Sequence, residues 1–305
     1  MKKFRKPTVL LAFLSLTICL AGMVRAEEKG AAKSVAPFSV KVTGSGRPMI
    51  LIPGLSCGGD VWDQTVAHFK GHYECHVLTL AGFAGQPAIG EPMLENIRTG
   101  LEKYIREKKL DHPVVVGHSL GGFMAFWLAA KAPDQVGAII AVDGLPFLPA
   151  IFDPNATVES SKGFAESYRS KYDSVSQEEF AANNRKFLES MITDVKDVEA
   201  VNTFGKKSDP KAVGLAFYEL MTTDLRPLVK AIKTPVLLIG ATASNPDPQA
   251  RATVEGIYQQ QVSTIAKHKV VFAPKARHFI QLDEPEFFYA QVESFLKDSD
   301  ASKAK

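Results

Sequence analysis

Short runs of consecutive hydrophobic residues recur along this chain, and longer helix-like segments separate them. The runs are rich in Val, Ile and Leu, which is typical of strands buried on both faces of a sheet. They lie at 49–52, 75–80, 114–116, 136–142, 235–240 and 269–272. The helix-like segments lie at 61–70, 94–109, 123–130 and 285–296. This alternation predicts an α/β fold with a mostly parallel central sheet and helices on both of its faces.

Two stretches depart from the alternation. Residues 38–42 change between apolar and polar at every step, which predicts a half-exposed edge strand. From 145 to 228 no strand-like run occurs, and charged helix-like segments follow one another at 158–171, 177–195 and 210–221. Because this stretch is too long for a simple crossover connection, we expect a helical cap at 145–228. It would be inserted into a core formed by 38–144 and 229–298.

Residues 1–26 have the pattern of a secretory signal peptide. Basic residues precede a hydrophobic run at 9–24, and the small residues Val24 and Ala26 lie at the −3 and −1 positions before the expected cleavage site. The run is shorter than the ~20 residues that a membrane-spanning helix needs, so we favour cleavage over a retained anchor. We therefore expect an exported protein, periplasmic or secreted, with no membrane contact after cleavage and a flexible leader at 27–37.

The excess of basic over acidic residues in the whole sequence comes from residues 1–26. The sequence has 36 basic and 33 acidic residues, a net charge of +3. Residues 1–26 hold five basic residues and no acidic one, so the remainder has 31 basic and 33 acidic residues and a net charge of −2. This balance argues against nucleic acid or another polyanion as the partner.

The expected mature chain keeps two cysteines, Cys57 and Cys75. The first follows the C-terminal end of one predicted strand, and the second lies near the start of the next parallel strand. These ends should be further apart than the ~7 Å between Cα atoms that a disulfide tolerates. We therefore predict two free thiols, although export permits a disulfide.

The most informative motif is Gly117-His118-Ser119-Leu120-Gly121, between a buried strand and a helix. In this context Gly-x-Ser-x-Gly forms a nucleophile elbow, a tight turn that forces the serine into a strained backbone conformation. Glycines flank the turn because side chains there would collide with neighbouring backbone. The turn exposes the Ser119 hydroxyl above the sheet edge, at the positive end of the following helix. We expect Ser119 to be a nucleophile.

A serine hydroxyl needs a base to accept its proton, and His278 is the candidate. It follows the last predicted strand, so it should lie on the same rim of the sheet as the elbow. Its position late in the chain, after the nucleophile, matches the order that this motif requires. The other six histidines lie inside the elbow, at helix ends or near strand starts, which suits the role less well.

These features together resemble the α/β-hydrolase fold superfamily over residues 38–296. The resemblance rests on Ile52-Pro53-Gly54-Leu55, the elbow, the cap, and Ala276-Arg277-His278-Phe279 followed by a helix start at 283–286. It implies a triad of nucleophile, acid and histidine under a cap, with no cofactor. No His/Cys cluster has metal-ligand spacing, so we expect no metal.

Two backbone amides form the oxyanion hole in this family. One belongs to the residue after the nucleophile, which is Leu120 here. The other comes from the loop after the early strand, where the resemblance points to the amide of Leu55. The loop reads Pro53-Gly54 where the family usually has His-Gly, a change that leaves the backbone donors in place.

The triad acid is the point at which the sequence departs from the family pattern. Most members carry an aspartate a few residues after the strand that corresponds to 236–239, but this loop holds no acidic residue before Asp247. Some members place the acid after the preceding strand, where this chain has Asp143. A carboxylate on a rigid strand end can hold the imidazole better than one on a loop that contains proline. We favour Asp143, with Asp247 as the alternative.

The expected function is hydrolysis of a small ester or related acyl substrate through a Ser119–His278–Asp143 triad and an acyl-enzyme. Peptides and carbon–carbon bonds are alternative substrates within the fold. The unusual position of the acid keeps a second class open, a protein that binds a small ligand with little or no turnover.

Overall fold

The computed structural model describes residue 1 and residues 35–303. Apart from residue 1, the predicted signal peptide and residues 27–34 of the predicted leader lie outside the described residues. Among those that are described, no helix combines the length and hydrophobicity needed to cross a membrane. The chain from Val35 onward forms one compact unit, and its division into core and cap stays a prediction.

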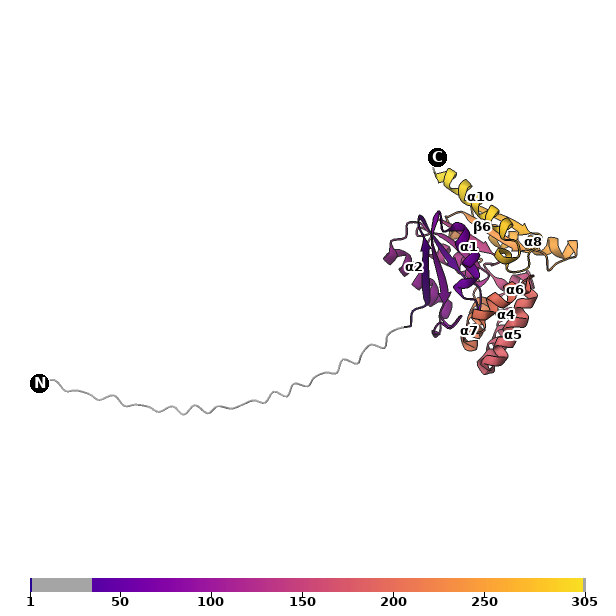
Figure 1. Cartoon of the computed structure of the whole chain (residues 1–305), viewed down its shortest axis with the longest axis horizontal. Coiled ribbons are helices and arrows are strands. Elements are labelled where there is room, and N and C mark those ends of the chain that lie inside the picture. The colour runs from indigo at the N-terminus through magenta and orange to yellow at the C-terminus, as the bar shows by residue number, and fades with distance from the viewer. Residues whose placement is uncertain (2–34, 304–305) are drawn as a thin grey trace. The chain divides into compact units, whose positions relative to one another are not determined.

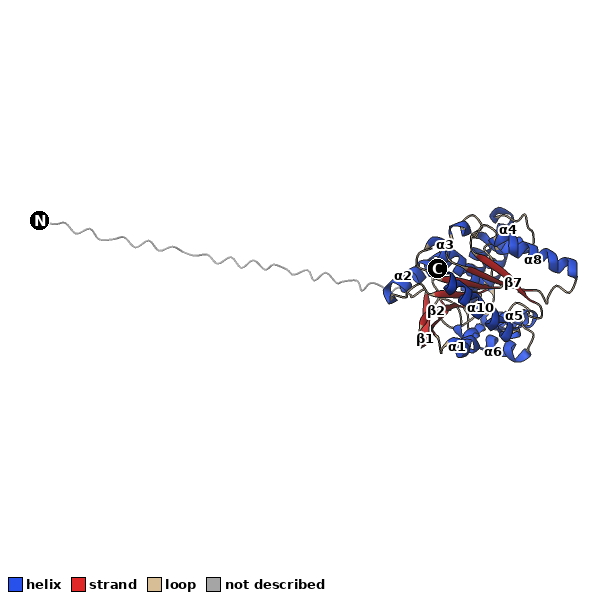
Figure 2. Ribbon diagram, turned by 90° about the horizontal axis from the view of Figure 1, so that it is seen from above, coloured by secondary structure: helices blue, strands red, loops and turns tan. Residues whose placement is uncertain are grey.

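A seven-stranded sheet with the order β1-β3-β2-β4-β5-β6-β7 forms the centre of this unit (Figure 2). β1 runs antiparallel to β3, and the other neighbouring pairs are parallel. The strands are β1 (Phe38–Gly44), β2 (Arg47–Ile52), β3 (Tyr73–Leu80), β4 (Val114–His118), β5 (Ala138–Val142), β6 (Val236–Ala241) and β7 (His268–Ala273). Each of the six strand-like runs between residues 49 and 272 forms a strand, and the predicted α/β fold is confirmed.

The parallel pairing brings the C-terminal ends of the middle strands to one edge of the sheet. Ile52 of β2 pairs with Gly117 of β4, and His118 of β4 pairs with Val142 of β5. Val142 pairs in turn with Ile239 of β6. The loops that leave these four strands therefore meet at a single rim, where open α/β sheets bind their ligands.

Helices cover both faces of the sheet, because its strands present apolar residues to two separate layers. One layer includes α2 (Met93–Lys108), α3 (Leu120–Lys131) and α8 (Pro248–Val262). The other includes α1 (Asp63–Phe69) and α10 (Pro285–Lys303). The chain also forms four short helices: η1 (Gly59–Trp62), η2 (Leu148–Ile151), η3 (Val229–Ala231) and α9 (Ile280–Asp283). β4 and β5 are buried along their whole length between the layers.

The segment where the sequence predicts a cap holds four longer helices between β5 and β6 (Figure 1). They are α4 (Val158–Ser174), α5 (Gln177–Met191), α6 (Val195–Gly205) and α7 (Pro210–Thr222). α4 packs along α7, and α5 packs along α6. The helix predicted for 177–195 ends at Met191, and α6 follows it without a counterpart among the predicted elements. α6 starts where the Asp194 side chain accepts a hydrogen bond from the Lys196 amide.

α8 has no counterpart among the predicted elements. It begins with Asp247 at its N-cap and Pro248 at its first position, a common start of a helix. Its buried residues are confined to its last turns, from Ile257 to Val262, so its hydrophobic periodicity is weak. At the other end of the chain, α10 continues past the predicted end at residue 296 to Lys303.

Cys57 and Cys75 are free, as predicted, and both are buried. Burial raises the pKa of the Cys57 thiol far above its ordinary value and that of Cys75 to about 11. Both thiols therefore stay protonated at neutral pH and pack as small apolar groups.

Candidate active site

Ser119 lies on a sharp turn between β4 and α3, with φ 54° and ψ −116°. This conformation is strained for a serine and persists only because its surroundings hold it. A Cβ at Gly117 would lie 2.0 Å from the Gly121 carbonyl oxygen, and one at Gly121 would lie 2.1 Å from the Ile52 carbonyl oxygen. Neither position has room for a side chain, so the elbow requires both glycines.

The loop after β2 passes directly beside the elbow. A Cβ at Gly54 would lie 3.3 Å from Ser119 Cβ and 2.9 Å from His118 Nδ1. Leu55, one of the two predicted oxyanion donors, is the next residue of this loop. Leu120, the other, is the first residue of α3, where amides have no carbonyl one turn earlier in the helix to bind. Both predicted donors belong to backbone that borders Ser119.

His278 lies in the loop after β7 and contacts Asp143 at the end of β5. The distance from His278 Nδ1 to Asp143 Oδ2 is 2.6 Å. The two side chains are 22% and 9% exposed, so water competes little for this contact. The ring of His118, next to Ser119, lies 4.7 Å from the His278 ring, measured between centroids. Because Asp143 occupies Nδ1, Nε2 is the nitrogen with which His278 can accept a proton.

Asp143 is held on both of its oxygens. Oδ1 accepts hydrogen bonds from the Ala241 amide at 2.9 Å and from the Tyr258 hydroxyl at 2.8 Å, which leaves Oδ2 for His278. Burial raises the pKa of Tyr258 well above its ordinary value, and the charge of Asp143 adds to the effect. The phenol therefore keeps its proton and remains a donor. These contacts fix the carboxylate before any substrate arrives.

Asp247, the alternative acid, has a different task. Its Oδ2 accepts a hydrogen bond from the Ala250 amide at 2.7 Å, which caps α8. Within the described part of the chain it makes no hydrogen bond with His278. Of the two candidate acids, the structure brings Asp143 to the histidine and leaves Asp247 on the helix cap.

In the part of the chain that the structure describes, no hydrogen bond joins the Ser119 hydroxyl to His278. In enzymes without bound substrate, catalytic hydrogen bonds are often long and shorten only when substrate binds. The geometry therefore supplies a strained serine, a carboxylate-bound histidine close to the elbow, and backbone amides beside the serine.

The family model described as alpha/beta hydrolase fold matches residues 47–285. The chain belongs to the α/β-hydrolase fold family. The match begins at β2 and ends at the start of α10, so it spans the elbow, both candidate acids and His278. The family expected from the sequence is thereby confirmed.

Curated relatives of this α/β-hydrolase are esterases. A pimeloyl-[acyl-carrier protein] methyl ester esterase from Vibrio parahaemolyticus is 26% identical over 262 residues, which cover 84% of this chain and 96% of the relative. The enzyme of the same name from Pectobacterium carotovorum is 24% identical over 251 residues, 82% of this chain and 94% of the relative.

Solved structures show the same fold at lower identity. The enol-lactonase from Burkholderia xenovorans has a TM-score of 0.69 and 17% identity, over 85% of this chain and 96% of its own. A thermophilic esterase from Thermogutta terrifontis has a TM-score of 0.67 and 19% identity, over 86% of this chain and 93% of its own.

The contacts of two residues in the site could not be predicted from the sequence. Tyr258 lies on α8, a helix with weak periodicity, and nothing in the pattern links it to Asp143. His118 is visible in the elbow, but its contact is not: burial lowers its pKa, so the neutral ring donates from Nε2 to the His278 carbonyl oxygen at 3.0 Å. The residue before Ser119 thus holds the loop that carries the candidate base.

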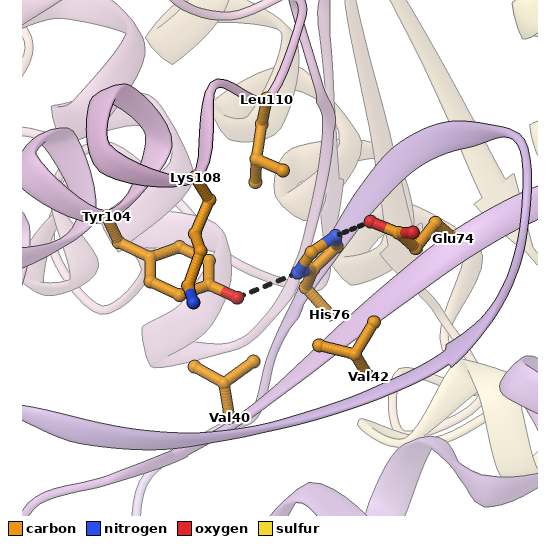
Figure 3. A pocket seen from close by; sticks show the side chains of 7 residues that line it. All are labelled: Val40, Val42, Glu74, His76, Tyr104, Lys108 and Leu110. Carbon is orange, nitrogen blue, oxygen red and sulfur yellow. Dashed lines mark hydrogen bonds and ion pairs between the residues drawn. The ribbon is translucent and has the colours of Figure 1, made fainter.

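A pocket of 430 Å³ lies elsewhere, between β1, β3 and α2 (Figure 3). Its histidine, His76, has Nδ1 2.8 Å from the Tyr104 hydroxyl and Nε2 2.8 Å from Glu74 Oε1. Because both ring nitrogens are occupied, His76 offers no free base. Within the described part of the chain, no cluster of His, Cys, Asp or Glu has the geometry of a metal site.

Proposed function

We propose that this α/β-hydrolase cleaves small carboxylic esters with Ser119 as nucleophile, His278 as base and Asp143 as the acid that orients it. The observation that carries the proposal is the 2.6 Å contact between His278 and Asp143 beside the strained elbow. A carboxylate on Nδ1 holds the imidazole in the tautomer whose Nε2 can take the serine proton, and it stabilises the imidazolium that forms.

The reaction proceeds in two halves. Ser119 Oγ attacks the ester carbonyl while its proton passes to His278 Nε2, and the carbonyl oxygen becomes an oxyanion that the amides of Leu55 and Leu120 stabilise. The tetrahedral intermediate expels the alcohol, which takes the proton from His278, and an acyl-enzyme remains. Water then attacks the acyl group while its proton passes to His278 Nε2. The bond between Ser119 Oγ and the acyl carbon breaks, Oγ takes the proton back from His278, and the carboxylic acid leaves.

The relatives favour an ester over a peptide or a carbon–carbon bond as the substrate. The two curated relatives described above are named as methyl ester esterases, and the neighbours in structure include a lactonase and an esterase. We therefore place the substrate of this chain among esters with a small alcohol group and an aliphatic acid group. The four helices between β5 and β6 act as the cap over the site.

The decisive experiment measures turnover by wild type and Ser119→Ala on two groups of substrates. One group is short-chain nitrophenyl esters, and the other is methyl esters of dicarboxylic acids that are not attached to a carrier protein. Wild type should hydrolyse members of both groups, and the variant should lose about 10⁴-fold or more of kcat. Failure of the wild type to turn over any ester would contradict the proposal. A thermal shift with an ester and no product over hours would instead favour the ligand-binding alternative.

We also propose that the protein is exported and that its signal peptide is removed. The support is the basic, hydrophobic and small-residue pattern of residues 1–26. Expression of the full chain in a bacterial host and mass measurement of the exported fraction test this. A mature protein that begins near Glu27 is expected, whereas an intact Met1 end in that fraction would contradict cleavage.

A further inference from the structure

Buried polar side chains join the loop after β2 to the inserted helices. They are Ser56, Asn184, Asn202 and Ser208. The Ser56 hydroxyl donates to Asn184 Oδ1 at 3.1 Å, and Asn184 Nδ2 donates to Asn202 Oδ1 at 3.1 Å. Asn184 lies on α5 and Asn202 on α6, and the two amides are each 8% exposed. A buried side-chain amide without a hydrogen-bond partner lowers the stability of the fold. This row of hydrogen bonds therefore fixes how the helices lie on the loop.

The backbone of Ser56 is held from the same side. The Ser208 hydroxyl, which is fully buried, donates to the Ser56 carbonyl oxygen at 3.3 Å and accepts from the Ala84 amide at 2.9 Å. A Cβ at Gly205 would lie 2.9 Å from Asn184 Nδ2 and 3.0 Å from the Ser56 carbonyl oxygen. The helical segment therefore packs against Ser56 with no spare room.

Ser56 has a backbone conformation that needs such support. Its φ is 60°, in the left-handed region that favours glycine. It belongs to a tight turn closed by a hydrogen bond from the Cys57 amide to the Gly54 carbonyl oxygen at 3.2 Å. Leu55, the expected oxyanion donor, lies inside this turn. A strained residue persists only where its surroundings over-determine it. Here Asn184 Oδ1 at 3.1 Å and the Gly205 carbonyl oxygen at 3.4 Å accept from the Ser56 hydroxyl, and Ser208 donates to the Ser56 carbonyl oxygen.

We propose that Asn184 is a positioning residue, which holds the oxyanion loop in its active shape by fixing Ser56. The inference rests on the proposed function, in which the Leu55 amide stabilises the oxyanion. It follows that the oxyanion hole forms only when α5 and α6 pack against the loop after β2. If these helices lift, Ser56 loses its partners and the turn around Leu55 relaxes.

The kinetic test compares Asn184→Ala with Arg185→Ala. Arg185 is the next residue of α5 and binds Glu189 and Glu199 at the surface, so its variant loosens the helical segment without touching Ser56. Because a misplaced oxyanion donor affects the transition state more than substrate binding, Asn184→Ala should lower kcat about 10- to 100-fold. Its KM should stay within about twofold of wild type, and Arg185→Ala should change neither constant by more than about twofold.

Ser56→Gly separates positioning from general stability. Glycine adopts a positive φ without strain, so the turn should keep its shape without help from Asn184. Asn184→Ala should therefore have little further effect on kcat in the Ser56→Gly background, a non-additivity that a double-mutant cycle measures. The same loss of kcat in both backgrounds would overturn the proposal.

Hydrogen exchange gives a readout that does not depend on activity. The amides of residues 54–58 should exchange faster in Asn184→Ala than in wild type and should be unchanged in Arg185→Ala. Unchanged exchange in both variants would overturn the positioning role. If the wild type hydrolyses no ester but residues 54–58 still exchange faster in Asn184→Ala, the result supports the contact between Asn184 and the loop. It then contradicts only the proposed function.

Discussion

Two neighbouring loops at the rim of the sheet each carry an aspartate, and the structure uses them in opposite ways. Asp143 directly follows β5, and its carboxylate is shared among Ala241, Tyr258 and His278. Asp247 lies beyond β6 in a loop that leads into α8, and its carboxylate caps that helix at Ala250. Both are aspartates beyond parallel strands, but one is placed for chemistry and the other for local structure.

The difference shows how the structure holds the acid that we propose for the triad. The strand before Asp143 pairs on both sides and is buried throughout, so the carboxylate begins from a rigid position. The β6 loop still contributes, because its Ala241 amide binds the same carboxylate. The β6 loop, where the resemblance implies the acid in most members, therefore supplies a hydrogen-bond donor to the proposed acid on the neighbouring strand.

The largest effect is expected from Asp143→Asn. An amide cannot hold the imidazole in the reactive tautomer or stabilise the imidazolium, so kcat should fall about 10⁴-fold. Asp247→Asn is the matched variant, and it should retain kcat within about twofold, because asparagine also caps helices well. Steady-state kinetics on one nitrophenyl ester compare the two. A larger loss for Asp247→Asn would reverse the assignment of the acid.

A smaller effect is expected from Tyr258→Phe. It removes one hydrogen bond to the buried Asp143 carboxylate, and bonds to charged groups are worth about 1.5 kcal/mol or more. We expect kcat to fall about tenfold. The control is Tyr104→Phe, which removes a tyrosine–histidine hydrogen bond in the pocket beside β1 and should leave kcat unchanged. Equal kcat values for wild type and Tyr258→Phe would show that the Ala241 amide alone suffices.

The smallest effect on activity is expected from Asp247→Ala. Loss of a helix N-cap should lower the free energy of unfolding by about 1 kcal/mol, while kcat and KM remain those of wild type. Thermal or denaturant unfolding measures the first quantity on the same protein sample that is used for kinetics. Unchanged stability together with reduced kcat would contradict the structural role of Asp247.

The parts of this site that follow from local pattern can be predicted from the sequence, and those that depend on packing cannot. Ser119 is found because glycines must flank a strained serine, and His278 because parallel strands end at one edge. The sequence narrows the acid to Asp143 or Asp247, and the choice needs the side-chain contacts. Tyr258 and Asn184 leave no signal, because each reaches its partner from a helix far away in the chain.

The same limit explains the differences in the fold. The strands follow from continuous hydrophobic runs, which only a buried sheet accommodates. α8 is missed because only its last turns are buried. The break between α5 and α6 depends on the cap formed by Asp194, a short polar signal inside a charged stretch.

Covalent labelling shows whether Ser119 is a nucleophile that His278 activates. Wild type, Ser119→Ala and His278→Ala are treated with a fluorophosphonate, and the rate and position of the adduct are read by peptide mass mapping. We predict one adduct, on the peptide that contains Ser119, no adduct in Ser119→Ala, and labelling slowed about 10³-fold or more in His278→Ala. Labelling of Ser119→Ala at the wild-type rate, or no labelling of wild type, would contradict the account.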